Sequence, residues 1–311
     1  MSGWGIVPGS SNAGFFLLLD QKKEEDTEIN YDSARELKVF LEERRLGMRK
    51  KFGQNFLINR TVRNKLVDVL GVEKGGRVWE IGPGLGAMTR ELLDRGAIVR
   101  AFEIDPGFIR VLKELFGGEG NFSLVEGDVL KTWREAGEGD YLLGNLPYNI
   151  GAVFLANLIE EGRFFRRMVV TVQKEVARRA AALPGSADYS SFSLLCASAY
   201  QVSPLMTIRG PSFYPAPHVD SQGLCFERKT GSPAYPAVFY PLVRALFASR
   251  RKMIKNNLHH FIASRGRGGE DAGALTGEIL KTCGLGGDER AEVLDLKTFG
   301  DLAKTLEDRL Q

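Results

Sequence analysis

Residues 77–86 read RVWEIGPGLG, and this stretch decides the fold. A short apolar run leads directly into closely spaced glycines, and a helical pattern begins at about Met88. Glycines between a strand and a helix let the backbone approach a ligand closely, and the N–H groups at the start of the helix are free to bind it. The stretch therefore predicts the first strand, turn and helix of a Rossmann-like α/β sheet.

The rest of the chain repeats this strand–helix alternation. Further strands are predicted near residues 98–102, 122–126, 140–144 and 168–173, with a closing pair at 200–208 and 222–228. Such alternation is typical of a doubly wound sheet, which binds ligands across the carboxyl ends of its strands. From about residue 232 the pattern is helical. We therefore predict a disordered extension over residues 1–32, a sheet domain over 33–231 and a smaller all-helical domain over 232–311.

Acidic side chains stand at the ends of three predicted strands. Glu103 and Asp128 follow the second and third strands, where carboxylates suit ribose hydroxyls and an adenine amine. Glu80 precedes the glycine loop, where a carboxylate would repel a pyrophosphate but could orient a sulfonium and ammonium ligand. The acids therefore favour S-adenosylmethionine, although the glycine loop alone would also fit an NAD dehydrogenase.

The tetrapeptide Asn145-Leu146-Pro147-Tyr148 follows the fourth strand. The Asn145 side-chain oxygen and the Leu146 carbonyl can both accept hydrogen bonds from an NH₂ group, and Pro147 has no N–H to compete. Tyr148 offers a ring face on which a base can stack. The motif predicts a site that holds a flat exocyclic amine against an electrophile.

Composition narrows the class of protein. The chain has 311 residues, 43% hydrophobic and 26% charged, which is ordinary for a globular protein. Its three cysteines and three histidines lack the spacing of a disulfide framework or a metal site, so we expect no metal and a reducing, cytoplasmic setting. The apolar run at residues 15–19 is too short to span a membrane, and no membrane association is expected.

Basic residues are unevenly distributed, although the net charge is only +3. Residues 227–267 contain nine Lys or Arg and one acid, and smaller basic clusters occur at 44–51 and 163–167. Local basic clusters suit a protein that grips a phosphate backbone. If residues 250–255 are helical, Arg251 and Lys255 share a face. The predicted RNA-binding residues are Arg250, Arg251, Lys252 and Lys255.

Taken together, these motifs closely resemble the ribosomal RNA adenine N6,N6-dimethyltransferases, the KsgA-type enzymes. The resemblance runs from about Ser33 to near the C-terminus and rests on the segments 53–57, 80–86, 103–105, 127–128, 145–148, 173–177, 213–221, 250–252 with 256–258, and 290–292 with Leu294, in the family's order. The chain departs from the family at 151–154, where small hydroxylated residues and a proline are usual.

The resemblance implies a class I methyltransferase domain that dimethylates N6 of two adjacent adenosines near the 3′ end of small-subunit (16S) rRNA. The implied partner is an immature small ribosomal subunit, and we expect a monomer. Phe213 would cover the second face of a flipped-out adenine on Tyr148. The expected cofactor contacts are Gln54, Asn55, Leu57, Glu80, Gly82, Gly84, Glu103, Ile104, Asp128, Val129 and Asn145.

Two alternatives remain open. An adenine-N6 DNA methyltransferase would more often carry a proline where Leu146 stands, together with a separate target-recognition domain. A non-catalytic nucleic-acid-binding factor could keep the same fold and cofactor site, but the intact motif at 145–148 argues against lost activity. A methylation assay discriminates between them.

Overall fold

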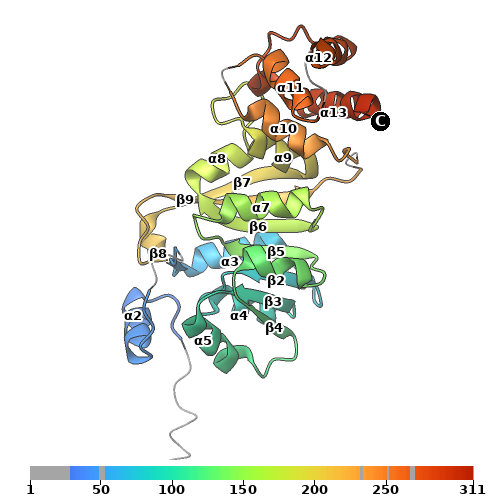
Figure 1. Ribbon diagram of the computed structural model, residues 1–311. Helices are drawn as coiled ribbons and strands as arrows, with labels where there is room; N and C mark the ends of the chain where they lie inside the picture. The colour runs from blue at the N-terminus through green and yellow to red at the C-terminus, as the bar shows by residue number, and fades with distance from the viewer. Residues whose placement is uncertain (1–28, 49–52, 232–233, 251, 267–269, 311) are drawn as a thin grey trace, which may run out of the picture.

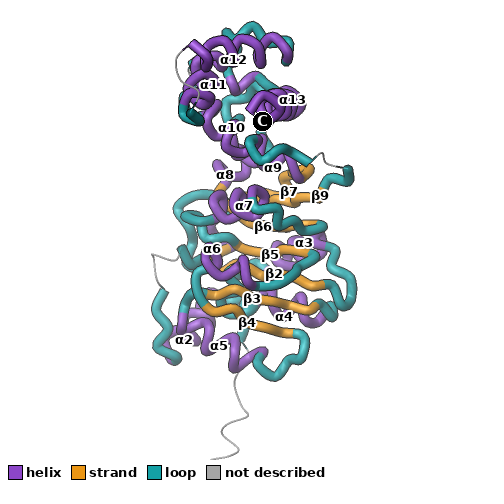
Figure 2. The backbone as a smooth tube through the Cα atoms, turned by 45° about the vertical axis from the view of Figure 1, so that its right-hand side comes forward, coloured by secondary structure: helices purple, strands orange, loops and turns teal. Residues whose placement is uncertain are grey.

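The computed structural model describes residues 29–48, 53–231, 234–250, 252–266 and 270–310. A large twisted sheet fills the middle of the molecule, and a helical region caps one end of it (Figures 1 and 2). The C-terminal helix lies in that cap, far from the N-terminal helix at the opposite end of the molecule (Figure 1). The predicted fold class, a doubly wound sheet with a helical C-terminal region, is confirmed.

The described strands form one seven-stranded sheet and one short ribbon. The order in the sheet is β4-β3-β2-β5-β6-β9-β7, and β1 pairs with β8. Strands β4 to β6 along this order are parallel, whereas β9 runs antiparallel to both β6 and β7. Their bounds are β1 (Phe56–Leu57), β2 (Arg77–Ile81), β3 (Ile98–Glu103), β4 (Phe122–Glu126), β5 (Tyr141–Asn145), β6 (Arg167–Gln173), β7 (Tyr200–Ile208), β8 (Phe213–Tyr214) and β9 (Ser221–Arg228).

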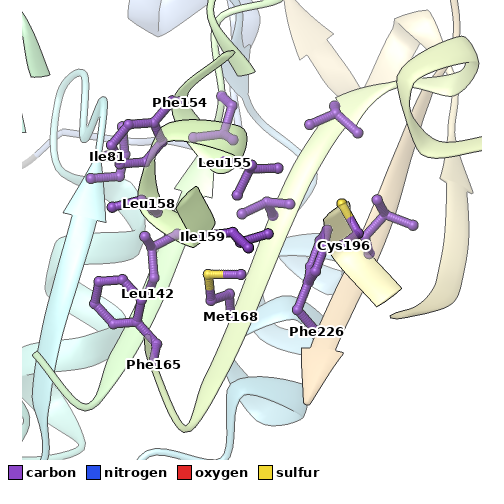
Figure 3. Packing of buried hydrophobic residues seen from close by; sticks show 14 of the residues in the cluster. Ile81, Leu142, Phe154, Leu155, Leu158, Ile159, Phe165, Met168, Cys196 and Phe226 are labelled. Atoms are coloured by element: carbon purple, nitrogen blue, oxygen red, sulfur yellow. The ribbon is translucent and has the colours of Figure 1, made fainter. Parts of the chain in front are cut away.

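Helices cover both faces of the sheet, which explains why its central strands are almost wholly apolar. The helices of the sheet domain and its N-terminal segment are α2 (Ala34–Glu43), α3 (Arg60–Leu70), α4 (Ala87–Asp94), α5 (Pro106–Phe116), α6 (Val129–Thr132), α7 (Gly151–Glu160), α8 (Lys174–Ala180) and α9 (Ser191–Ala199), with short 3₁₀ turns η3 (Trp133–Glu135) and η4 (Gly210–Ser212). On one face, Phe154 and Leu158 of α7 pack over Leu142 and Met168 of the sheet (Figure 3). The other face packs against α3 and α4.

The glycine loop between β2 and α4 has the geometry that its sequence requires. Gly82, Gly84 and Gly86 have φ angles of +66°, +59° and +89°, in the left-handed region that favours glycine. A Cβ on Gly86 would also lie 2.3 Å from the Phe116 ring of α5. The loop is therefore held close to its neighbours, and residues with side chains would disturb it.

The C-terminal helices form a second core of their own. They are α10 (Phe239–Phe247), α11 (Ile254–Ala263), α12 (Glu270–Thr282) and α13 (Leu296–Leu310), with the 3₁₀ turn η5 (Ala291–Val293). Leu242, Leu258 and Leu302 are among its fully buried residues, and Tyr189 and Leu194 from the sheet domain join the same cluster. The exact division at residue 232 stays a prediction.

Residues 29–32 pack against the sheet domain, so the expected extension ends earlier than we predicted. Ile29 is buried, in a cluster with Leu37, Leu85 and Phe108. The remainder of the expected extension, residues 1–28, lies outside the described residues. None of the helices in the described part of the chain combines the length and apolar character needed to cross a bilayer.

Candidate active site

A cavity of about 270 Å³ opens at the carboxyl ends of β2, β3 and β5, the edge at which ligands of this fold class bind. It brings together residues that are scattered along the chain. Those predicted from sequence are Gln54, Asn55, Gly82, Gly84, Glu103, Ile104, Asp128, Val129, Asn145, Leu146, Pro147 and Tyr148.

Asn145 is the last residue of β5, and its side chain has a fixed orientation. The Nδ2 amide group donates to the Asn55 carbonyl at 2.7 Å. The amide nitrogen is therefore committed to the protein, and Oδ1 is the atom that remains to accept from a ligand. An acceptor held in place at the cavity wall is what an exocyclic amine requires.

The residues after Asn145 are held by the backbone. The Leu146 N–H donates to Thr171 of β6 at 3.0 Å, and the Leu146 side chain is buried in the core, so its main chain is what it can offer to a ligand. The Pro147 carbonyl accepts from the N–H groups of Ile150 and Gly151, at 3.1 Å each. These bonds close the turn that leads into α7 and fix the direction of the motif.

Tyr148 stands at the cavity wall with its hydroxyl tied down. Its oxygen lies 2.5 Å from Oγ of Ser221. Ser221 is the first residue of β9 and is fully buried. A ring anchored at its far end has little freedom to rotate away. This supports its predicted role as a stacking surface.

Glu103 ends β3 and is almost completely buried. Its Oε1 accepts from the N–H groups of Ile104 and Asp105, at 2.8 Å each, and its Oε2 accepts from Gly84 N–H at 3.2 Å. Burial raises the pKa of Glu103 to about 7, and these hydrogen bonds offset only part of that effect. A carboxylate has about four lone-pair positions, so one more donor, such as a hydroxyl, can still be accepted.

Asp128 caps the N-terminus of α6. Its Oδ1 accepts from Leu130 N–H at 3.0 Å, which fixes the carboxylate beside the cavity. The preceding Gly127 has a φ of +118°, so the chain turns sharply there. The carboxylate can therefore serve as an acceptor for an amine, in the position expected from the sequence.

The N-terminal lid segment contacts the cavity through Gln54 and Asn55. Gln54 Nε2 donates to Asp105 Oδ2 at 3.1 Å, and Asn55 Nδ2 donates to the Gly53 carbonyl at 3.1 Å. Leu57 does not line this cavity; it lines a smaller hollow beside it. The segment is thus held by hydrogen bonds to Asp105, the N-cap of α5, and to Asn145 of β5.

Glu80 lies beneath the glycine loop and does not line the cavity. It is fully buried, and Thr89 Oγ1 donates to its Oε2 at 2.6 Å. Its Oε1 has no partner among the described residues. Burial raises the pKa of Glu80 to about 7; the hydrogen bond from Thr89 opposes part of this rise, and the Glu103 charge adds a smaller increase.

The donor and acceptor set fits S-adenosylmethionine. Fixed carboxylates at Glu103 and Asp128, which both line the cavity, suit a ribose and an adenine amine. Position 84 has to be glycine, because a Cβ there would lie 2.9 Å from the ring of Phe56, which also lines the cavity. The described residues that line the cavity include no Lys or Arg that could bind a pyrophosphate.

Phe213 is not in the cavity. It lies in β8, opposite Leu57 of β1, and is buried in the core behind the sheet. The expectation that it covers the second face of a base is not supported, because its ring is packed against other apolar side chains. The aromatic residues that do line the cavity and were missed are Phe56, Phe102 and Phe108.

Phe56 and Phe108 face each other edge to face, with ring centroids 5.4 Å apart. Phe56 directly follows Asn55, a predicted cofactor contact, so its position in the sequence could have identified it. Phe108 lies in α5 next to Ile109 and close to Val111 and Leu112, so no local pattern separates it from a core residue. Asn149 and Ile150 also line the cavity and directly follow the predicted motif.

The predicted RNA-binding residues are only partly available. Arg250 donates to the Ala187 and Tyr189 carbonyls at 3.0 and 3.1 Å, and Lys255 pairs with Asp288 at 2.6 Å. Lys252 is exposed, and Arg251 lies outside the described residues. Because α11 begins at Ile254, Arg250 and Lys252 precede the helix rather than forming part of it.

The role of the basic cluster at 163–167 in gripping a nucleic acid stays a prediction, because nothing in the structure tests it. It lies at the amino end of β6, at the edge of the sheet opposite the cavity. Arg166 pairs with Glu73 and Arg167 with Glu227, while Arg163 donates to the Gly137 carbonyl. Each of these three cations is therefore bound to another part of the protein.

Known proteins are similar to this chain in sequence. The ribosomal RNA adenine dimethylase family model matches residues 45–282. Ribosomal RNA small subunit methyltransferase A from Treponema denticola is 44% identical over 296 residues, covering 93% of this chain and 96% of that protein. The protein of the same name from Borreliella burgdorferi (strain ZS7) is 39% identical over 279 residues, covering 89% of this chain and 95% of its own length.

Solved structures agree on the fold. A dimethyladenosine transferase from Plasmodium falciparum has a TM-score of 0.69 at 24% identity, covering 81% of this chain and 97% of that chain. The 23S rRNA methyltransferase ErmE has a TM-score of 0.58 at 22% identity, covering 81% of this chain and 99% of its own.

Proposed function

This chain belongs to the ribosomal RNA adenine dimethylase family, and from that premise we propose how its site acts on two adjacent adenosines near the 3′ end of small-subunit rRNA. The protein is an S-adenosylmethionine-dependent rRNA adenine dimethyltransferase. The observation that carries the assignment of the site is the Asn145 amide, whose nitrogen is bound to Asn55 and whose oxygen is left for the substrate.

The reaction needs an adenine N6 amine outside the RNA stack, facing the cofactor. Tyr148 offers the ring on which the flipped base would lie, and Ser221 holds that ring in place. Asn145 Oδ1 and the Leu146 carbonyl would accept from the two N6–H groups. Such acceptors favour a pyramidal nitrogen and stabilise the positive charge that develops on it, an effect of about 3 kcal/mol for one preorganised group.

S-adenosylmethionine, when bound, supplies an activated methyl group on a sulfonium. Glu103 would hold its ribose hydroxyls and Asp128 its adenine amine, while Ile104 and Val129 line the wall beside them. Gly82 and Gly84 would let the ligand approach the backbone, and Gln54 and Asn55 would close over it. No side chain has to act as a strong base, because a methylated ammonium is acidic enough to lose its proton to water.

The finer proposal concerns the partner. We expect the substrate to be an immature small ribosomal subunit in the cytoplasm, bound by a monomer. Of the described residues predicted to bind RNA, Lys252 is exposed just before α11, and we expect it to contact phosphate. Arg250 and Lys255 already have protein partners, so they could reach RNA only by sharing or exchanging those bonds.

The test is a methyl-transfer assay with labelled S-adenosylmethionine. Small subunits from cells that lack this modification, naked small-subunit rRNA and duplex DNA would be compared, and the labelled nucleosides mapped. We expect N6,N6-dimethyladenosine at two adjacent positions in the subunits. Label in the DNA would favour a DNA methyltransferase, and RNA binding without any label would favour a non-catalytic factor.

A further inference from the structure

Leu146 would act through its main chain, so what holds this residue in place bears on the reaction. Its N–H donates to the Thr171 carbonyl at 3.0 Å. Its side chain is 1% exposed and belongs to the buried cluster that also contains Ile81 and Phe154 (Figure 3). These two attachments, one through the backbone and one through the side chain, set the direction of the Leu146 carbonyl.

Two glycines border the Leu146 side chain. Gly144 lies two residues before it in β5, and Gly151 is the first residue of α7. Neither has a φ angle in the left-handed region, so the backbone conformation at these positions does not require glycine. A glycine inside a strand often marks a place where another part of the protein approaches closely. The atoms that a side chain would meet therefore decide why each position is glycine.

The space beside Gly144 is occupied by Leu146. A Cβ on Gly144 would lie 2.9 Å from Leu146 Cδ2, 3.1 Å from the Ile81 carbonyl oxygen and 3.2 Å from Ile81 Cβ. Carbon atoms in ordinary contact are about 3.5–4.0 Å apart, so the added carbon and Leu146 Cδ2 would have to separate by about 0.6 Å or more.

Of the two neighbours of Gly144, Leu146 is the one that would move. Ile81 lies in β2, which is paired with β3 on one side and with β5 on the other, so its backbone is fixed. Leu146 follows the end of β5. Its side chain lies in a close-packed interior, which transmits strain, so a push on Cδ2 would displace its main chain as well.

We propose that Gly144 is a positioning residue for methyl transfer, because the side chain that it lacks leaves the space from which Leu146 directs its carbonyl at the N6 amine. The inference rests on the proposed function, in which this carbonyl is one of two acceptors. A misplacement of about 1 Å can lower a rate by about a hundredfold. A methyl group at position 144 should therefore slow the transfer, although Gly144 does not line the cavity.

Gly151 provides a matched control, because it borders the same side chain. A Cβ there would lie 3.4 Å from Leu146 Cβ and 3.4 Å from Val172 Cγ1. These distances are close to ordinary contact, so a methyl group fits at position 151 without moving Leu146. Comparing the two glycines separates a displacement of Leu146 from a general effect of added volume.

The experiment measures single-turnover methyl transfer to unmodified small subunits at saturating S-adenosylmethionine, with the cofactor Kd measured by calorimetry on the full chain. Gly144→Ala should lower the transfer rate about tenfold to a hundredfold and leave the cofactor Kd within about twofold of the wild-type value. Gly151→Ala should leave both quantities within about twofold of the wild type.

A second substitution tests whether the effect passes through Leu146. Leu146→Val removes one carbon where Gly144→Ala adds one, so the pair conserves volume and keeps the main-chain carbonyl. The double variant lacks Cδ2 and should transfer methyl groups about fivefold or more faster than Gly144→Ala alone. Shortening a buried side chain usually lowers stability, so a merely structural defect would not be reversed in this way.

Melting curves show whether Gly144→Ala is folded under the assay conditions. If it is unfolded, Leu146→Ile takes its place. This substitution conserves volume but branches the side chain at Cβ, the atom nearest to Gly151. It should lower the transfer rate about tenfold and leave the cofactor Kd unchanged, and an unchanged rate would overturn the inference.

Several results for the folded Gly144→Ala protein would also overturn the inference. A rate within about twofold of the wild type would mean that position 144 does not direct the carbonyl. A parallel loss of cofactor affinity, or a double variant no faster than Gly144→Ala, would mean that the methyl group acts through Ile81. An equal loss in Gly151→Ala would mean that added volume alone is responsible. By contrast, a wild-type protein that methylates no subunits would contradict the proposed function itself.

Discussion

Replacing Asn145 by alanine should nearly abolish methyl transfer while leaving the cofactor bound. The side chain makes two kinds of contact. Its Nδ2 bond to Asn55 holds the lid, and a bond of this kind contributes about 1 kcal/mol to stability. Its Oδ1 would face the reacting amine, where a preorganised group is worth about 3 kcal/mol in the transition state.

These magnitudes separate the two roles. Loss of the transition-state contact should lower kcat by about 10²- to 10³-fold. Loss of the lid contact should weaken S-adenosylmethionine binding by about fivefold. The assay is single-turnover methyl transfer to unmodified small subunits at saturating cofactor, with the cofactor Kd measured separately by calorimetry.

Asn121→Ala provides a matched control for the Asn145 variant. Asn121 Nδ2 also donates to a backbone carbonyl, that of Ala97, at 2.8 Å, but outside the cavity. Its removal should lower the free energy of unfolding by a similar amount. It should leave kcat within about twofold of the wild-type value, because this hydrogen bond lies outside the active site. If Asn145→Ala methylates within a few-fold of the wild type, Asn145 is not the acceptor for the reacting amine.

Three further predictions follow from the same geometry. The pKa of Glu80 is about 7 in the folded protein against an ordinary 4.5, so the folded state holds an extra proton, and the stability that this proton brings is full below pH 4.5 and lost as pH rises through 7. Glu103 has a similarly raised pKa and contributes a decline of its own, so Glu80→Gln should make the total decline between those pH values smaller by about 3 kcal/mol, measured by urea unfolding. An unchanged decline would show that Glu80 does not titrate in this range. Tyr148→Ala should raise KM for RNA by the equivalent of about 1–3 kcal/mol through lost stacking, whereas Tyr148→Phe, which loses only the Ser221 bond, should raise it far less; equal effects would refute stacking. Lys252→Ala should lower the slope of log RNA affinity against log salt by about 0.7–0.9, and an unchanged slope would mean that Lys252 does not touch phosphate.

The protein partners of the basic residues were invisible in the sequence, and for one reason. Arg250, Lys255 and the cluster at 163–167 read as free cations in sequence, yet each described member has a partner far along the chain. Arg250 reaches carbonyls 61 and 63 residues away. A run of basic residues reveals its charge but not the acids and carbonyls that folding brings beside it.

The sequence alone determined the sheet and the residues at its carboxyl edge. Alternating apolar runs, the glycine turn at 82–86 and the motif at 145–148 are local signals, because each depends on residues adjacent in the chain. Parallel strands end at one edge, so acids that follow successive strands, such as Glu103 and Asp128, must meet there.

Only the tertiary structure decided which groups are buried, paired or left unsatisfied. It moved Phe213 from the expected site into the core, anchored Asn145 to Asn55 across 90 residues, and brought Tyr31 to Leu85 across 54. No local pattern encodes such contacts, because they depend on where the chain returns after folding. The physical reason is that hydrogen bonding and burial are properties of neighbours in space, whereas turn and strand propensities are properties of neighbours in sequence.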